Sequence, residues 1–140
     1  MGTSRADKYT GVRKTTLYSD FTVDLFPHPD TKQLTLLKNQ NAIDSALRNL
    51  ALTNKYERFH NPRVGGNMKN QLFNNILPTT QKAIENSLKE MIRNYEPRAV
   101  AINVIASPTP DEEGYNVAVE YYERNSSVPV TTTIYLERIR

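Results

Sequence analysis

Two carboxylates have neighbours that distinguish them from the other acidic residues. Glu57 directly precedes Arg58, and Glu96 opens the tripeptide Glu96-Pro97-Arg98. A pair of carboxylates is enough for glycoside hydrolysis, but the general acid of that reaction needs a raised pKa. A nearby guanidinium lowers the pKa of a carboxyl group instead. The pattern therefore favours ion-paired carboxylates at the ends of structural elements, with Glu57 and Arg58 as a candidate ion pair, over acid catalysis.

Other residue types that carry chemistry are sparse. His28 and His60 are the only histidines, they lie far apart in the sequence, and there is no cysteine. The pair Gly65-Gly66 lacks the spacing of a phosphate-binding loop, so a sharp turn is the better interpretation. No serine stands in a nucleophile-elbow motif. The sequence therefore predicts no catalytic residue, no metal site and no cofactor.

The length and composition indicate one small domain. The chain has 140 residues, 38% of them hydrophobic, and a mean hydropathy of −0.62. No apolar run approaches the roughly 20 residues of a membrane span. An apolar signal core is also missing at the N-terminus, so we expect neither a membrane protein nor secretion by a cleaved signal peptide.

The positive charge is concentrated at the N-terminus. Residues 1–14 carry four basic side chains and one acidic side chain, which already equals the net charge of +3 of the whole chain. The interpretation as a flexible, solvated basic arm ranks first, docking of this arm on a protein partner second and nucleic-acid contact last. The domain over residues 15–140 is balanced in charge, so no nucleic-acid partner is expected.

The best-patterned helix lies in the segment Gln81–Arg98. Its apolar residues recur at helical spacing, and they are Ile84, Leu88, Met91, Ile92 and Tyr95. Thr79 or Thr80 is expected to cap its N-terminus. Pro97 disfavours helical backbone in the residue before it, so the helix should end near Tyr95 or Glu96.

The first half of the chain predicts a hairpin and two further helices. Residues 17–26 and 34–37 read as extended segments of a loose hairpin. A helix should follow, capped by Asn39 or Asn41, with Asp44 in its first turn. Residues 56–68 read as an irregular loop and residues 70–76 as a short helix.

The last third predicts three strands over residues 99–106, 115–123 and 130–138. Their apolar residues alternate, through Val100, Ile102 and Val104 in the first strand. Short turns join the strands, which indicates an antiparallel β-meander. We therefore predict an α+β fold: a small single domain with helices packed on an antiparallel sheet of three to five strands.

Four segments resemble one known family, the baseplate wedge subunits of contractile-tailed phages. These proteins are also called sheath initiators or "lysozyme-like" baseplate proteins, and type VI secretion baseplates have a counterpart. The matching segments span about residues 40–140 in the family's order, with Tyr56 in place of a family glycine and Tyr95 where the family often has tryptophan. They are 42–58, 61–73, 83–100 with the Glu-Pro-Arg motif, and 135–139.

The resemblance implies a structural role in the virion tail baseplate, in several copies around a six-fold axis, after assembly in the host cytoplasm. It implies that the motif region binds the helical core bundle of the other wedge proteins. The last strand would offer its edge to strands of the tail sheath protein, and tube-initiator proteins are further candidate partners. The residues implied are Tyr95, Glu96, Pro97 and Arg98 for the wedge, and Val130, Thr132, Ile134 and Leu136 for the sheath.

Several alternatives remain open at this point. Glu96 and Arg98 can pair within the chain or reach a partner, because a guanidinium binds carboxylates and carbonyls alike. The last strand of a small meander can be open or covered by the chain itself. A peptidoglycan-cleaving lysozyme that uses Glu57 or Glu96 is the alternative function, and a nucleic-acid binder that uses the basic arm is the third.

Overall fold

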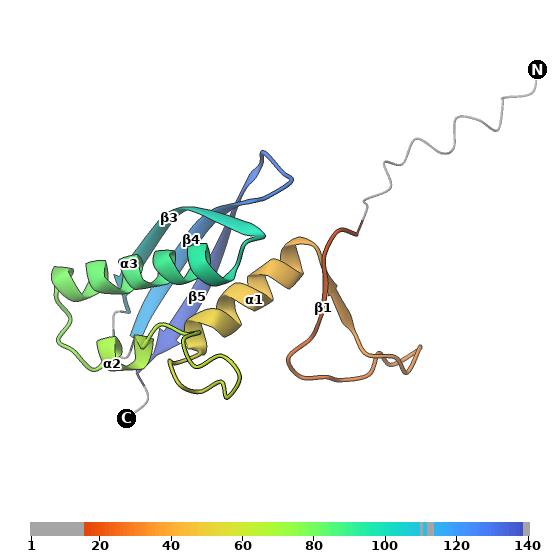
Figure 1. Cartoon of the computed structure of the whole chain (residues 1–140), viewed down its shortest axis with the longest axis horizontal. Helices are drawn as coiled ribbons and strands as arrows, with labels where there is room; N and C mark the ends of the chain where they lie inside the picture. Colours follow the sequence, from red (N-terminus) through yellow and green to blue (C-terminus); the bar gives the residue numbers. More distant parts are fainter. Residues whose placement is uncertain (1–15, 110, 112–113, 139–140) are drawn as a thin grey trace, which may run out of the picture.

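The computed structural model describes residues 16–109, 111 and 114–138, and it confirms the α+β fold (Figure 1). The predicted arm over residues 1–14 lies outside this part of the chain. Three antiparallel strands form one sheet in the order β3-β4-β5, and a separate two-stranded hairpin pairs β1 with β2. The elements are β1 Ser19–Phe21, β2 Leu36–Lys38, α1 Gln40–Leu52, α2 Met68–Leu72, α3 Pro78–Tyr95, β3 Ala99–Pro108, β4 Gly114–Glu123 and β5 Pro129–Glu137.

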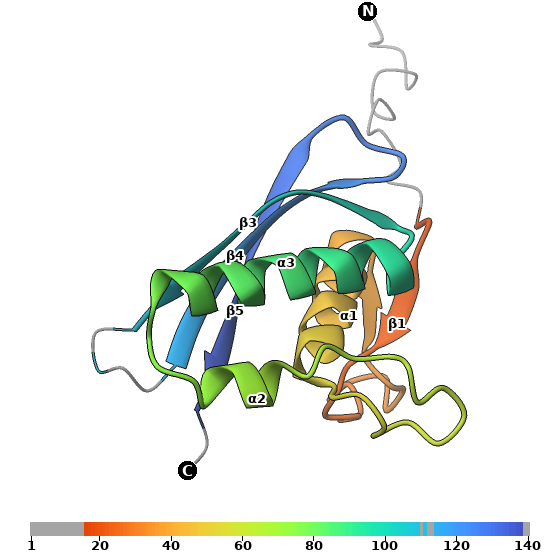
Figure 2. The same ribbon diagram turned by 60° about the vertical axis from the view of Figure 1, so that its left-hand side comes forward.

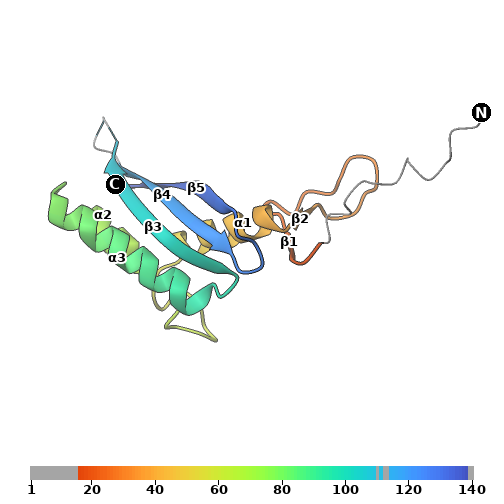
Figure 3. The ribbon, with the colours of Figure 1, turned by 90° about the horizontal axis from the view of Figure 1, so that it is seen from above.

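The core lies between the helices and one face of the three-stranded sheet (Figures 2 and 3). Both long helices bury an apolar stripe there, because their apolar residues recur every three or four positions. The fully buried side chains include Ile43, Leu47, Ile84, Leu88 and Ile92 from the helices and Val117, Val119, Tyr121, Ile134 and Leu136 from the strands. No helix in the described part of the chain is long and apolar enough to cross a membrane.

Helix α1 begins where the sequence predicts, but the side chain of its N-cap residue binds the hairpin and not the helix. Asn39 occupies the N-cap position without a side-chain cap. Its Oδ1 instead accepts hydrogen bonds from the backbone N–H groups of Leu17 (2.9 Å) and Tyr18 (3.3 Å). Asp44 lies beyond the first turn and accepts a hydrogen bond of 2.7 Å from the Tyr121 hydroxyl. The predicted dipole role of Asp44 is therefore wrong, and its partner is the sheet.

Helix α3 begins earlier than predicted. Pro78 is its first residue, where the fixed φ of proline fits a helix and the missing N–H has no cost. The Thr80 hydroxyl donates to the Asn75 carbonyl (2.8 Å) from inside the helix, so neither threonine is the cap. The end at Tyr95, ahead of Pro97, is as predicted.

A β-bulge changes which residues of β3 face the core. Pairing with β4 shifts register between Ala101 and Asn103, so Ile102 is the extra residue. Val100 and Ile102 are therefore exposed while Val104 is buried, and the predicted single apolar face is wrong.

The short helix α2 also starts earlier than predicted, at Met68, and ends at Leu72.

The hairpin of β1 and β2 projects from the N-terminal end of α1, away from the three-stranded sheet (Figures 1 and 3). Phe21 is paired with Leu36. The strands are shorter than predicted because the chain turns after Phe21 and Leu25 takes a positive φ of 50°.

Candidate partner-binding sites

The Glu-Pro-Arg motif forms the corner between α3 and β3. The Arg98 side chain donates two parallel hydrogen bonds to the Glu96 carboxylate, Nε to Oε1 at 2.6 Å and Nη2 to Oε2 at 2.8 Å. The Glu96 side chain is only 8% exposed and that of Arg98 29%. The pair therefore closes within the chain, while Pro97 and Tyr95 stay exposed at the turn.

The hairpin packs against this corner. The Arg98 guanidinium lies over the Tyr18 ring, 5.7 Å from its centre, at a distance typical of a cation–π contact. The hydrogen bonds that Arg98 donates to Glu96 are the main reason why the pKa of Arg98 is raised, and Asp20 of β1 adds to the effect. The corner therefore holds both the end of α3 and the base of the hairpin.

A cavity of about 360 Å³ opens beside this corner. Asp20 of the hairpin, Arg58 and Asn61 of the loop, and Tyr95 and Glu96 of the corner contribute to its wall. The structure thus brings Arg58 together with two residues of the motif. Sequence reasoning assigned no role to Asp20, which belongs to no recognisable motif, or to Asn61, which lies in the matching segment 61–73.

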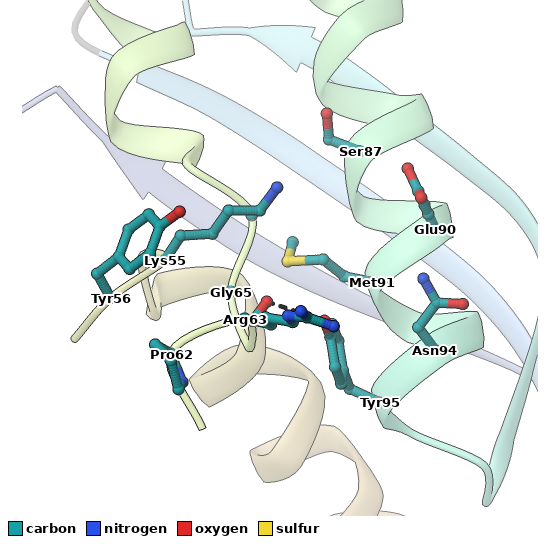
Figure 4. Close-up of a pocket in the computed structure, with 11 residues that line it drawn as sticks. Lys55, Tyr56, Pro62, Arg63, Gly65, Ser87, Glu90, Met91, Asn94 and Tyr95 are labelled. Atoms are coloured by element: carbon teal, nitrogen blue, oxygen red, sulfur yellow. Dashed lines mark hydrogen bonds between the residues drawn. The ribbon is translucent and has the colours of Figure 1, made fainter. Parts of the chain in front are cut away.

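A second cavity, of about 310 Å³, lies between the loop and α3 (Figure 4). The Tyr95 hydroxyl closes one end by donating to the Arg63 carbonyl (2.8 Å), the bond that is dashed in Figure 4. Lys55 and Glu90 line the wall from opposite sides, with Met91 between them. Tyr95 therefore lines both cavities and ties α3 to the loop.

Glu57 stabilises the loop and does not pair with Arg58. Its carboxylate accepts from the Asn54 N–H (2.9 Å) and the Asn54 Nδ2 (2.7 Å), and its ion pair is with Lys69 (3.8 Å). The Asn54 side chain contributes most to lowering the pKa of Glu57. A lowered pKa does not suit a general acid. The expected ion pair between Glu57 and Arg58 is thus replaced by one with Lys69.

The two edges of the three-stranded sheet differ. At β3, the Glu85 carboxylate accepts from the Ala106 N–H (3.1 Å) and the Lys89 Nζ donates to the Ile102 carbonyl (3.4 Å). Side chains of α3 thereby occupy backbone groups that would otherwise be free for another strand. At β5, the described residues pair only with β4 on one side. The open edge is therefore β5.

Burial raises the pKa of Glu85, but the hydrogen bonds from Ala106 and Lys82 outweigh it, so this pKa lies below its ordinary value. The sequence signal for this edge contact is slight, because Glu85 and Lys89 look like an ordinary exposed i, i+4 pair.

The alternation of an antiparallel ladder shows which groups of β5 are free. The Ala106 N–H points away from β4 and towards Glu85, so Ala106 and its partner Val117 are a pair without hydrogen bonds between them. The N–H and C=O groups of Val117 therefore point to β5, where Val117 is paired with Ile134. Backbone groups of Thr132 and Ile134 are therefore used by β4, and those of Thr133 point to the open edge. By the same alternation, the backbone groups of Thr131 and Tyr135 also point to the open edge.

The four residues that the resemblance implies for the sheath thus face the core. Ile134 and Leu136 are fully buried, and Val130 and Thr132 are half-buried. Their side chains anchor β5 in the core. The backbone groups that remain free for pairing with another strand are those of Thr131, Thr133 and Tyr135.

The described residues contain no group of three or more acidic, histidine or cysteine side chains that could hold a metal ion. Glu57 and Glu96 each accept hydrogen bonds from side chains of their own chain, Glu57 from Asn54 and Glu96 from Arg98. The described residues form a small α+β domain with an ion-paired corner, two cavities beside it and one open sheet edge.

Comparisons with known proteins agree with this class. The sequence model of the family "Baseplate wedge protein gp25" matches residues 38–127, and the chain belongs to this family. The protein of that name from Enterobacteria phage T4 is 35% identical over 81 residues. That match covers 56% of this chain and 58% of the T4 protein, so the chain spans less than two thirds of this relative.

Two solved structures share the fold. The crystal structure of a "putative tail lysozyme" from Geobacter sulfurreducens has a TM-score of 0.64 at 27% identity, over 70% of this chain and 89% of that one. A subunit of the six-fold symmetrised baseplate of the anti-feeding prophage has a TM-score of 0.60 at 24% identity, over 88% and 87% of the two chains. The chain is therefore a member of a family of baseplate wedge proteins.

Proposed function

We propose that this protein binds the helical core bundle of the baseplate wedge at its Glu-Pro-Arg corner and templates the tail sheath at the open edge of β5. The difference between the two sheet edges carries the second half of this proposal. Side chains of α3 block β3, whereas the outward N–H and C=O groups of β5 are available for an added strand. The protein acts in several copies in the virion baseplate, after assembly in the host cytoplasm, and cleaves no peptidoglycan.

Wedge binding, the first half of the proposal, is supported by the exposed groups around the cavity beside the corner. Because Glu96 and Arg98 satisfy each other, the groups left for a partner are those around the cavity, with Arg58 and Tyr95 exposed at its rim. An exposed arginine beside an aromatic ring is a common anchor in protein interfaces. The pair of Glu96 and Arg98 then positions this surface.

The wedge contact is tested by co-purification with the neighbouring wedge proteins. Arg58→Ala should weaken this complex about tenfold or more and leave the melting temperature unchanged. Arg48→Ala is the matched control, because Arg48 is exposed on α1 and lines neither cavity. Equal complexes from the two variants would count against the corner as the wedge site.

The sheath contact is tested at Thr133. Thr133→Pro removes an outward N–H that β4 does not use, so the fold should persist while sheath polymerisation on assembled baseplates is lost. Thr133→Val keeps the N–H and should polymerise sheath normally. Normal sheath on baseplates that carry the proline variant would refute strand addition at this edge.

Lysozyme activity is the second candidate function, because the Geobacter protein of the same fold is called a tail lysozyme. It is tested by incubating the purified protein with peptidoglycan beside Glu57→Gln and Glu96→Gln. We expect no cleavage by any of the three proteins. Cleavage that disappears in a glutamine variant, while assembly with wedge proteins persists, would overturn the structural proposal.

A further inference from the structure

A third cavity, of about 240 Å³, opens at the C-terminal end of β5, which lies beside α2 in Figures 1 and 2. Helix α1 contributes Ala51 and Leu52 to its wall, and helix α2 contributes Met68 and Leu72. Lys69 also lines it and is ion-paired with Glu57 (3.8 Å). The helix side of the cavity is therefore mostly apolar.

The opposite wall of this cavity is the open edge of the sheet. It consists of three consecutive residues of β5, Tyr135, Leu136 and Glu137. The side chains of consecutive strand residues alternate between the two faces of a sheet, so these three cannot all point into one cavity from the same face. The cavity therefore borders the edge of the strand itself. This is the edge at which the described residues of β5 have no second neighbouring strand.

Contacts between the end of β5 and the end of α2 hold these walls in place. The Arg138 Nη2 donates to the Phe73 carbonyl (3.2 Å), and the Arg138 guanidinium lies 5.8 Å from the centre of the Phe73 ring. Met68, Leu72 and Leu136 are anchored in the core. The cavity is therefore formed before any partner binds, which lowers the entropic cost of filling it.

A strand that pairs with the end of β5 has to pass across this cavity. Leu136 faces the core, and residues side by side on neighbouring strands point their side chains to the same face. The residue of the added strand beside Leu136 therefore points towards α1 and α2. The backbone groups of Leu136 are used by Tyr115 of β4, so an antiparallel neighbour makes no hydrogen bonds with Leu136. Side chains approach most closely at such positions.

We propose that this cavity binds one large apolar side chain of the strand that the tail sheath protein adds to β5. An apolar cavity of about 150 Å³ can hold a benzene molecule, so this one has room for a large aliphatic or aromatic side chain. A charged side chain would lose its hydration there. Because a shift of one residue turns every side chain to the other face, the cavity also selects one register of the added strand. This inference rests on the proposed strand addition and names the chemistry that the added strand needs.

Benzene tests the cavity without the sheath protein. In the NMR spectrum of the full-length chain, benzene should shift the methyl signals of Ala51, Leu52 and Leu72 in a saturable way. Val104 is the internal control, because it is buried in β3 and does not line the cavity. Signals that stay unchanged up to the solubility limit of benzene, or that shift equally at Val104, would overturn the proposal.

Leu52→Lys tests the cavity with the sheath protein. Leu52 is 50% exposed, so a lysine there should leave the melting temperature unchanged while it places a charge at the cavity. The concentration of sheath protein at which half of the baseplates carry polymerised sheath should rise about tenfold or more. Leu52→Met keeps the wall apolar and should behave like the unmodified protein. Leu36→Lys is the matched control, because Leu36 is 48% exposed on β2 and lies outside the cavity.

Thr133→Pro separates a failure of this inference from a failure of strand addition. If Thr133→Pro blocks sheath polymerisation while Leu52→Lys behaves like Leu36→Lys, strand addition stands and the role of the cavity is refuted. Equal losses in the two lysine variants would refute it as well, because the effect would not depend on the cavity. Normal sheath on baseplates with Thr133→Pro would refute strand addition and this inference together.

Discussion

Arg98 and Glu96 form a two-pronged ion pair across a single proline, and this pair makes the corner where the helical half of the domain meets the strand half. The pair is largely buried on the Glu96 side. The Arg98 N–H also approaches Glu96 Oε1 (3.3 Å), so the carboxylate collects donors from the backbone and the side chain of one residue. The motif therefore acts as a structural clamp, and the proposed wedge partner would bind the surface that this clamp positions.

Arg98→Ala should destabilise the domain by about 2–4 kcal/mol, because it leaves a buried carboxylate without its cation. The stability of Arg98→Lys should lie between that of the unmodified protein and that of Arg98→Ala, since an ammonium keeps the charge but cannot make two parallel hydrogen bonds to the carboxylate. Urea unfolding measures the change. In a double-mutant cycle, Glu96→Gln combined with Arg98→Ala should cost clearly less than the sum of the single changes. Additive effects would show that the pair contributes nothing beyond its separate groups.

The elements could be predicted from the sequence where the signal is local. The helical spacing from Ile84 to Ile92, and Pro97 after it, gave the position and end of α3. The alternation through Val117, Val119 and Tyr121 gave the buried face of β4. Such patterns depend on the periodicity of one element, and tertiary contacts change them little.

The rest depends on contacts between distant segments. The bulge at Ile102 has no sequence signal of its own, and it moved two apolar residues out of the core. Asn39 has the residue type of a cap, but it binds the hairpin backbone 21 and 22 positions away. Likewise, the choice of Lys69 over Arg58 as the partner of Glu57 follows from the path of the loop. The local sequence therefore identified residues that form important contacts, but not the residues that they contact.

Glu85 should give the domain a measurable acid sensitivity. Its folded pKa lies below the ordinary value of 4.5, so its charged form adds stability at pH values above 4.5. This contribution is lost as the pH falls through 4.5 towards the folded pKa. Glu85→Gln should therefore flatten the dependence of the melting temperature on pH below about 4.5. An unchanged acid slope in this variant would contradict the contact with Ala106.

Removing the same side chain should also expose the β3 edge. In Glu85→Ala the Ala106 N–H loses its acceptor and becomes free for pairing with another chain. We expect slow aggregation with increased thioflavin fluorescence at neutral pH. Glu90→Ala serves as the control, because Glu90 lies on the same helix and makes no described contact with β3.

Two buried tyrosines of β4 should respond in opposite directions to loss of their hydroxyl. Tyr121→Phe breaks the hydrogen bond to Asp44, so it should cost about 1–2 kcal/mol. The Tyr115 hydroxyl is buried without a described hydrogen-bond partner. Tyr115→Phe should therefore be neutral or stabilise by up to about 1 kcal/mol. Urea unfolding of both variants distinguishes the cases, and an equal loss would imply a partner for Tyr115.

The two adjacent glycines of the loop should tolerate a methyl group differently. Gly65 has a φ of +120°, and a Cβ there would lie 2.6 Å from the Thr53 carbonyl oxygen. Backbone strain and a backbone clash both oppose Gly65→Ala, so it should cost about 2–3 kcal/mol or more. A Cβ at Gly66 would meet the end of the Met91 side chain, which is flexible and can move. Gly66→Ala should therefore cost less than Gly65→Ala in the same unfolding experiment, and the reverse order would contradict the described path of the loop over α3.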